Sequence, residues 1–334
     1  MENRYVPQKE DFRFLDRKDL NVDRNYASQS YWKGVMIHFF KNRRAVIGLV
    51  IITIIILLAI FGPLLSSFGY RDIVQYRNEN NKRVVARGIQ PQIPALYELF
   101  TGQKAEGDFS QYTFLFGTDD MGRDLWTRTW YGARVSLLIA FVTIFIDMII
   151  GMSYGLISGY FGGATDSIMQ RFVEIANSVP RLVIVSVLAI FMAKGMGLVI
   201  VALLLTEWIG MSKIARAEML KTKEQEYVLA SRTLGARNGH IIFREILPNT
   251  IGPIITQVMF SIPTAIFTEA FLSYIGIGVQ APKCSWGSLA QAASMVYKLY
   301  PYQLIIPAFF ICTTMLSLNM LGDGLRDALD PKMH

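Results

Sequence analysis

The sequence predicts an all-α polytopic membrane protein with six transmembrane helices. Of its 334 residues, 52% are hydrophobic and only 18% are charged, and the mean hydropathy is +0.33. This composition is typical of membrane proteins rather than of soluble enzymes. Long apolar runs also alternate with polar segments along the chain. The net charge of +7 is explained by basic loops on the cytoplasmic side of a membrane, without nucleic acid as a partner.

The chain begins with a predicted cytoplasmic segment, residues 1–45. Residues 1–30 carry many charges of both signs, so we expect them to be loosely ordered. Residues 31–40, YWKGVMIHFF, are either an amphipathic elbow in the membrane interface or a lead-in to the first span. His38 has no second ligand nearby, so we expect no metal there. The first long apolar run follows this charged segment, which is unlike a cleavable signal peptide.

The first span is the clearest one. Residues 46–65 hold no charge and match the length that a bilayer requires, and we assign 46–67 to this helix. Lys41, Arg43 and Arg44 precede it and place its start in the cytoplasm. Residues 68–134 then form an extracytoplasmic loop, in which Asp119, Arg123 and Asp124 are expected to make an ion-paired turn.

Residues 135–322 are predicted to form a core of five further spans. The second span is 135–157, and small residues at 151, 155 and 159 favour close helix packing in lipid. A cytoplasmic turn is expected at 161–171, and Pro180 is expected to kink the third segment, 172–193. The fourth span is 198–211, continuing helically towards 216.

The last two spans are 250–277 and 304–320. The cytoplasmic loop 213–248 lies between the fourth and fifth spans, and its many Lys and Arg residues agree with the positive-inside rule. Residues 323–334 form a short cytoplasmic tail. Six spans put both termini in the cytoplasm.

Within this loop, residues 224–248 predict two helices joined by a turn. Thr222 and Gln225 have capping-box spacing for a first helix that starts at 223. Gly235 is a natural stop, since glycine accepts the left-handed conformation without strain. Asn238 can cap the second helix, and Pro248 marks its expected boundary. The alternative interpretation is an ordinary solvated cytoplasmic loop between two membrane spans.

The same loop resembles that of binding-protein-dependent ABC importer permeases. The runs EYVLASRTLGA and IIFREILPN match the family at Glu226, Tyr227, Ala230, Gly235, Leu247 and Pro248. They depart from it at Leu229, Ser231 and Glu245. The resemblance implies that this loop is a coupling helix that docks on an ATPase, through Glu226, Tyr227, Val228, Ala230, Ser231, Leu234, Gly235 and Ala236.

Further segments resemble the peptide-importer branch of this family, in the family's order. They are FGTDDMGRDLWTRTWYGARVSL (116–137), EIANSVPRL (174–182), EAFLSYIGIGVQAPKCSWG (269–287) and LGDGLRDALDP (321–331). The implied fold is the type I ABC importer permease fold. The implied role is the second, C-type permease of an oligopeptide or dipeptide importer in the cell membrane.

This resemblance also implies a set of partners. They are a homologous second permease, two ATPase subunits that bind ATP and Mg, and an extracytoplasmic peptide-binding protein. Peptides would cross by alternating access at the interface between the two permeases. The chain itself has no G-x-x-x-x-G-K sequence and no metal or nucleophile motif, so we expect neither catalysis nor a cofactor in it. Cys284 and Cys312 have no metal-site spacing, and we expect no disulfide between them.

Three acidic residues, Asp147, Glu207 and Glu269, fall within apolar segments. Such residues are costly in lipid and usually face a bundle interior or a wet cavity. They either line a polar translocation path or are buried against other helices. The same residues support an alternative function, an ion-coupled solute carrier that works alone. A nickel-importer permease of the same family is a second alternative.

Overall fold

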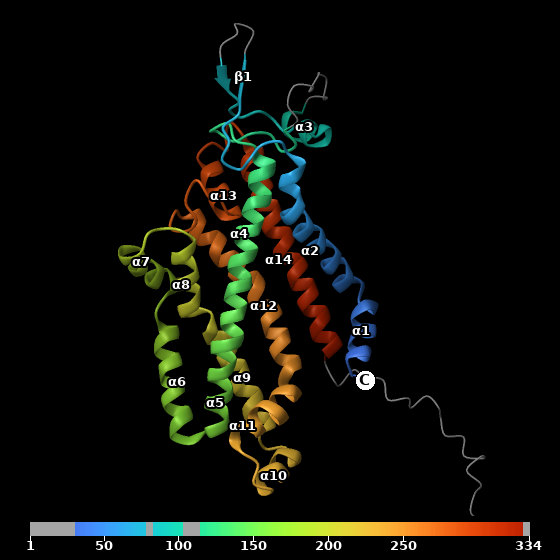
Figure 1. The fold of residues 1–334 in the computed structure, drawn as a ribbon, viewed down its shortest axis with the longest axis vertical. Helices are drawn as coiled ribbons and strands as arrows, with labels where there is room; N and C mark the ends of the chain where they lie inside the picture. The colour runs from blue at the N-terminus through green and yellow to red at the C-terminus, as the bar shows by residue number, and fades with distance from the viewer. Residues whose placement is uncertain (1–30, 78–82, 103–113, 330–334) are drawn as a thin grey trace, which may run out of the picture.

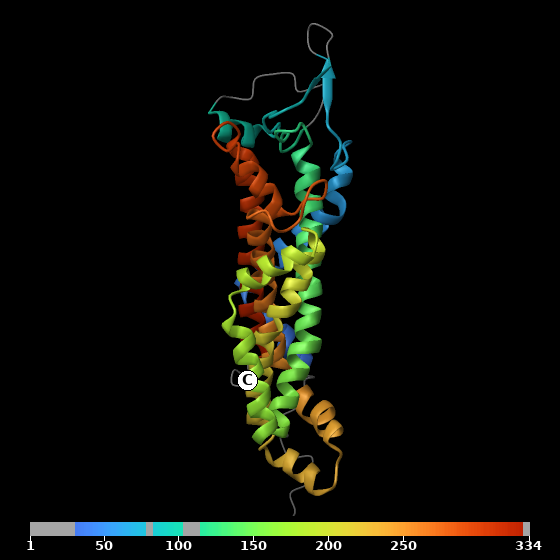
Figure 2. The same ribbon diagram turned by 90° about the vertical axis from the view of Figure 1, so that its left-hand side faces the viewer.

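The computed structural model describes residues 31–77, 83–102 and 114–329. They form an elongated helical bundle with a small cap at one end and helix α10 at the other (Figure 1, Figure 2). Within the described residues, five helices are long and apolar enough to cross a membrane, and a bent pair makes up to six. The six predicted spans therefore fit when the pair counts as one. The predicted tail segments 1–30 and 330–334 lie outside the described residues.

Helices α1 (Tyr31–Lys41) and α2 (Arg43–Phe61) open the described chain, and a 3₁₀ turn, Gly62–Leu65, ends the first span. Asn42 separates the two helices and caps α2 by accepting from the N–H groups of Arg44 and Ala45. Val35 and Phe39 on α1 are buried against the end of α14, whereas Trp32, Met36 and Phe40 are more than half exposed. This amphipathic pattern favours the interfacial elbow over a simple lead-in.

The second span begins earlier than predicted. It runs from Leu125 to Phe161 as α4 (Leu125–Ile146), a π-helical segment (Asp147–Met152) and α5 (Ser153–Phe161). Residues 125–134, predicted as the end of an external loop, are therefore helical, and their place outside the membrane stays a prediction. The helix begins here because Asp124 caps it, its side chain accepting from the N–H groups of Trp126 and Thr127.

The glycine spacing in this span does produce close packing. A Cβ on Gly151 would lie 2.6 Å from the Trp208 carbonyl oxygen, and one on Gly155 would lie 2.2 Å from the Ser212 carbonyl oxygen. Both contacts are with α9 (Trp208–Thr222), which follows α8 (Met196–Thr206) in the fourth span. The small residues thus let two backbones approach each other, as predicted.

Helices α6 (Gly163–Ser178) and α7 (Arg181–Phe191) form the broken third segment, and they are bent by 78°. The kink at Pro180 is confirmed. The cytoplasmic turn predicted for 161–171 was wrong, because Gly162 and Gly163 alone turn the chain with positive φ and α6 starts at once.

The predicted helix-turn-helix loop is present with different boundaries. Helix α10 is Glu226–Thr233, and Gly235 has φ +82°, so the expected left-handed stop is confirmed. Thr222 instead ends α9, and Gln225 precedes α10 without a side-chain cap, so the predicted capping box was wrong. Arg237, not Asn238, is the N-cap residue of the next helix.

Pro248 does not end a helix. Helix α11 (Asn238–His240), a π-helical segment (Ile241–Ile246) and α12 (Leu247–Tyr274) form one continuous span. Pro248 closely follows the π-helical segment, and such an irregularity is one of the ways in which a helix accommodates a proline in its interior.

Helix α13 (Trp286–Ser294) follows on the outer side, and α14 (Pro301–Leu329) completes the bundle. The segment predicted as a tail from 323 onward is helical as far as Leu329, where α14 continues along α1 and α2, and its place in the cytoplasm stays a prediction. Gly324 permits this contact, since a Cβ there would lie 2.1 Å from the Ala45 side chain.

The cap contains structure that the all-α prediction missed. Strands β1 (Gln75–Arg77) and β2 (Arg83–Val85) pair antiparallel, and α3 (Pro94–Thr101) lies at the same end of the bundle (Figure 1). Tyr302 of α14 fastens the cap, with its hydroxyl 2.8 Å from the Thr118 carbonyl oxygen.

The turn predicted around Asp119 is confirmed in part. Arg123 Nε donates to Asp119 over 2.7 Å, and Arg128 Nε lies 3.4 Å from the same carboxylate. Asp124 instead caps α4 and accepts from the Ser66 hydroxyl over 2.7 Å. Cys284 and Cys312 are free thiols, as expected, and burial raises the pKa of the Cys284 thiol.

Candidate functional site

Three regions contain the residues singled out from the sequence. Helix α10 is at one end of the bundle, a cavity lies between α7, α8 and α12, and a buried serine cluster joins α4 to α12. They are separate, so the predicted coupling residues and the three acidic residues do not form one site.

Helix α10 is fixed to the bundle by a single buried side chain. Val228 is fully buried and packs in a cluster with Tyr160, Met219 and Ile242. Ser231 adds a hydrogen bond from its hydroxyl to the Glu245 carboxylate. Val228 and Ser231, two of the predicted coupling residues, therefore hold α10 in place.

The turn after α10 is attached in the same way. Ala236 is half-buried against the same cluster. Tyr160 donates from its hydroxyl to Asn238 Oδ1 over 2.8 Å, and the Arg232 guanidinium lies 5.6 Å from the centre of the Tyr160 ring. Gly235 supplies the turn between the two helices.

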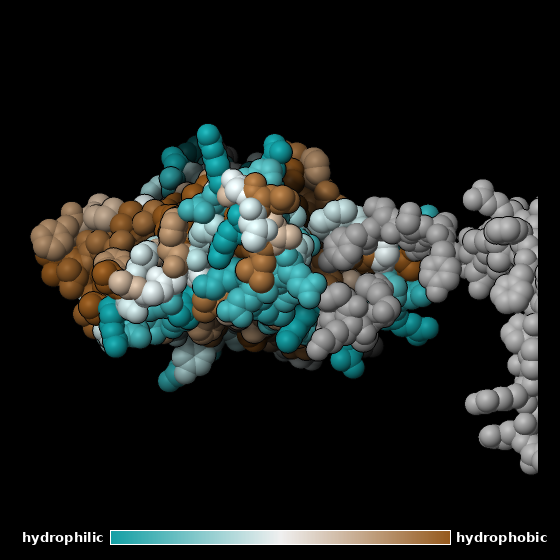
Figure 3. Space-filling view, turned by 90° about the horizontal axis from the view of Figure 1, so that it is seen from below, coloured by the Kyte–Doolittle hydropathy of each residue, from teal (hydrophilic) through white to brown (hydrophobic). Residues whose placement is uncertain are grey.

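The outer face of α10 is exposed. Glu226 and Ala230 are exposed, and Leu234 is 88% exposed. Partial burial raises the pKa of the Tyr227 phenol, so its hydroxyl stays neutral at physiological pH. Leu229, at the position where the family has Glu, is 45% exposed and joins this face. Seen end-on, hydrophobic residues stand among hydrophilic ones here (Figure 3).

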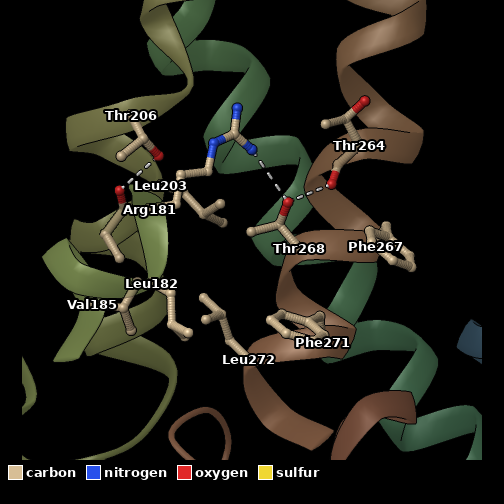
Figure 4. Close-up of a pocket in the computed structure, with 11 residues that line it drawn as sticks. Arg181, Leu182, Val185, Leu203, Thr206, Thr264, Phe267, Thr268, Phe271 and Leu272 are labelled. Atoms are coloured by element: carbon tan, nitrogen blue, oxygen red, sulfur yellow. Dashed lines mark hydrogen bonds between the residues drawn. The ribbon is translucent and has the colours of Figure 1, made fainter. Parts of the chain in front are cut away.

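A cavity of about 360 Å³ lies between α7, α8 and α12 (Figure 4). Arg181, the first residue of α7, lines it. Arg181 Nη1 donates to Glu207 Oε1 over 2.6 Å and lies 3.5 Å from the Thr268 hydroxyl. Sequence reasoning missed Arg181 as a site residue, although it directly follows the helix-breaking Pro180.

Asp147 lies deeper in the bundle, at the start of the π-helical segment. Its side chain is fully buried, and among the described residues neither carboxylate oxygen has a hydrogen-bond partner. Asp147 is not among the residues that line the cavity, whereas Arg181 lines it and is ion-paired with Glu207.

Glu269 lies in a different setting. It is fully buried and accepts hydrogen bonds from the hydroxyls of Ser136 and Ser273, each over 2.7 Å. Ser273 Oγ also accepts from the N–H of Val279 over 3.1 Å. This carboxylate therefore joins α4, α12 and the loop after α12. A role for it in a translocation path stays a prediction.

The serine cluster leads to a test of that role. We expect Glu269→Leu to lower the midpoint of thermal unfolding in detergent, because each buried hydroxyl that loses its acceptor costs about 1–3 kcal/mol. Glu269→Gln keeps an acceptor oxygen and should cost less. Size-exclusion chromatography after heating measures both variants. Loss of transport by Glu269→Gln at unchanged stability would contradict the structural role and support the path.

Two family models match parts of this chain. Residues 151–334 match the family model "Binding-protein-dependent transport system inner membrane component". Residues 30–83 match the "N-terminal TM domain of oligopeptide transport permease C".

Curated relatives cover nearly the whole chain. The oligopeptide transport system permease protein OppC of Bacillus subtilis (strain 168) is 43% identical over 92% of both chains. The dipeptide transport system permease protein DppC of the same organism is 41% identical over 92% of this chain and 88% of its own. OppC of Escherichia coli (strain K12) is 34% identical over 95% of this chain and 99% of its own.

Solved structures support the fold. An inward-facing form of the MetNI methionine ABC transporter aligns with a TM-score of 0.52 and 17% identity, covering 61% of this chain and 96% of that chain. A second form aligns with a TM-score of 0.51 and 15% identity, over 60% and 94%. The bundle therefore has the type I importer permease fold. The chain belongs to the family of inner membrane components of binding-protein-dependent transport systems, with the N-terminal transmembrane domain of oligopeptide transport permease C.

Proposed function

We propose that this chain is one permease subunit of an ATP-driven importer that moves peptides into the cell. The observation that carries the proposal is the family match together with peptide permeases at 34–43% identity over most of the chain. Family membership does not favour an ion-coupled carrier that works alone. The relatives' names favour peptides over nickel.

Helix α10 is the proposed contact with the ATPases. The structure supports this with a short helix at the tip of the bundle that is anchored on one face and exposes Leu229 and Leu234 on the other. An ATPase subunit docked on this face would remove both leucine side chains from water, which favours association. ATP and Mg would be bound by the ATPase subunits, whose closure would bias the permease between two states.

Charge supports an orientation with α10 in the cytoplasm. Lys41 ends α1, and Arg43 and Arg44 begin α2. The lower end of α1 and the end of α14 point towards the same side of the bundle as α10 (Figure 1). The positive-inside rule assigns this side to the cytoplasm. Both termini would then be cytoplasmic, and the cap with β1, β2 and α3 would meet the binding protein outside.

Helices α6 and α7 supply the proposed contact with the second permease. Both lie at one side of the bundle in Figure 1, and both expose large apolar side chains. Exposed fractions reach 77% at Ile190 and 81% at Phe191. Because α7 also borders the cavity, a partner on this face would enclose the cavity between the two permeases.

The test is purification of the tagged chain from native membranes in mild detergent, followed by reconstitution in vesicles with the binding protein. We expect ATPase subunits and a second permease to co-elute, with vanadate-sensitive ATP hydrolysis and ATP-dependent peptide uptake. A chain that elutes alone and moves solute down a proton gradient would refute the proposal. ATP-dependent uptake of nickel instead of peptide would refute the substrate.

A further inference from the structure

The cavity between α7, α8 and α12 has one polar end and one apolar end. At the polar end lie Arg181 and the hydroxyls of Thr206, Thr264 and Thr268. Each of these hydroxyls donates to a backbone carbonyl of its own helix, at 3.1, 3.0 and 2.8 Å respectively. Their oxygen lone pairs remain available as acceptors towards the cavity.

Arg181 keeps its carboxylate-binding edge free. Its interactions with Glu207 and Thr268 both use Nη1. Among the described residues, Nε and Nη2 have no hydrogen-bond partner. These two nitrogens form the fork that binds a carboxylate through two parallel hydrogen bonds. The side chain is 48% exposed, so a ligand can reach it, while Glu207 fixes the direction of the guanidinium.

The opposite end of the cavity is built from hydrocarbon. Leu182 and Val185 of α7 face Leu203 of α8 and Phe271 and Leu272 of α12 (Figure 4). Burying an aliphatic or aromatic side chain in such a setting is favourable. The volume of about 360 Å³ is within the range of small-ligand pockets.

We propose that this cavity receives the C-terminal residue of the transported peptide. Arg181 binds the free carboxylate through Nε and Nη2, and an apolar C-terminal side chain enters the end lined by Val185, Leu203 and Phe271. A chain terminus is the part of a peptide that offers a main-chain carboxylate next to a side chain. This inference rests on the proposed function and adds a chemical preference to it.

The principal variant is Arg181→Met combined with Glu207→Gln. The double change avoids leaving a buried carboxylate unpaired, which would destabilise the fold by itself. The complete importer is reconstituted with its binding protein, and uptake is measured for a leucine-terminated pentapeptide as the free acid and as the amide. We expect the acid-to-amide ratio of kcat/KM to fall about tenfold relative to wild type, as for loss of a charge-assisted hydrogen bond.

The binding protein is the same in every assay, so any preference of its own cancels in the comparison with wild type. The matched control is Arg171→Met combined with Glu174→Gln. This pair on α6 is also joined at 2.7 Å, but its side chains are 79% and 60% exposed and do not line the cavity. We expect its acid-to-amide ratio to equal that of wild type.

A second variant tests the apolar end. Phe271→Ala removes the ring without placing a charge in the span, and Phe271 is 45% exposed, so the variant should fold. It should lower uptake of the leucine-terminated peptide relative to a lysine-terminated one, because the apolar contact with the leucine side chain is lost. An unchanged leucine-to-lysine ratio would refute that end of the proposal.

Two results would overturn the carboxylate contact. One is an equal loss of acid and amide uptake in the Arg181 variant. The other is a phospholipid that co-purifies with wild type, is lost from the variant by mass spectrometry, and leaves the uptake ratio unchanged. If wild type itself imports no peptide while its ATPase is active, the proposed substrate fails, and this outcome is distinguishable from both.

Discussion

Gly155→Ala should destabilise the bundle more than any other single-methyl addition in its second span. The new Cβ would lie 2.2 Å from the Ser212 carbonyl oxygen and 2.8 Å from Ala215 Cβ. Both neighbours belong to α9, and one is backbone, so no side-chain rotation relieves the overlap. We expect a loss of about 3 kcal/mol or more, at the upper end for overpacking, seen as a lower midpoint of thermal unfolding in detergent.

Gly210→Ala is the matched control. Gly210 also lies in a span helix, α9, but a Cβ there would meet only Gln257 Nε2, at 3.7 Å. The same substitution should therefore leave the unfolding midpoint unchanged or raise it slightly, since alanine favours helix. Equal effects at Gly155 and Gly210 would show that α5 and α9 do not pack closely in the membrane.

The contrast between these glycines shows what the sequence predicts well. Small residues at 151, 155 and 159 repeat every four positions, and this local pattern was enough to predict a close helix contact. Which helix would make the contact was not predictable. The partner, α9, lies some 60 positions along the chain (155 to 215). A helix face that contacts lipid is as apolar as one that contacts another helix, so the sequence does not indicate which helices are neighbours.

Errors at the helix ends have a common physical reason. Residues 163–171 and 323–329 are polar, and a polar segment next to an apolar span predicts a loop. In the structure they are helical, because a helix that extends beyond the membrane needs no apolar residues on its water-facing sides. Likewise 125–134 is helical because Asp124 caps it, a signal that was present in the sequence.

For a similar reason, the sequence predicted the position of helix α10 but not how the acidic residues are arranged. Helix α10 is a local feature ended by Gly235, and its position followed from the sequence. The three acidic residues were grouped only because each falls in an apolar run. The structure separates them, since Glu269 has serine partners on α4 and α12. Arg181 and Glu207 meet only because α7 folds back at the 78° bend.

The residue at the tip of α10 should matter for assembly and not for folding. Leu234 is 88% exposed, so Leu234→Asp removes no buried contact, and the unfolding midpoint of the isolated chain should not change. Burial of a leucine side chain in a complex is worth about 2 kcal/mol, and an aspartate in its place would have to be desolvated. We therefore expect the ATPase subunits to be lost during purification and ATP-dependent uptake to fall at least about thirtyfold.

The control places the same change at the other end of the molecule. Leu99 on α3 is 73% exposed, so Leu99→Asp adds the same charge at a similarly exposed site in the cap and should retain the ATPase. Gly235→Pro is a second variant that should lose the ATPase, because proline fixes φ at about −65° whereas Gly235 has φ +82°. The backbone of the turn after α10 would have to change its conformation. The spans, which do not include this turn, would keep their packing. Normal ATPase stoichiometry in both Leu234→Asp and Gly235→Pro would show that the motor subunits dock elsewhere on this surface.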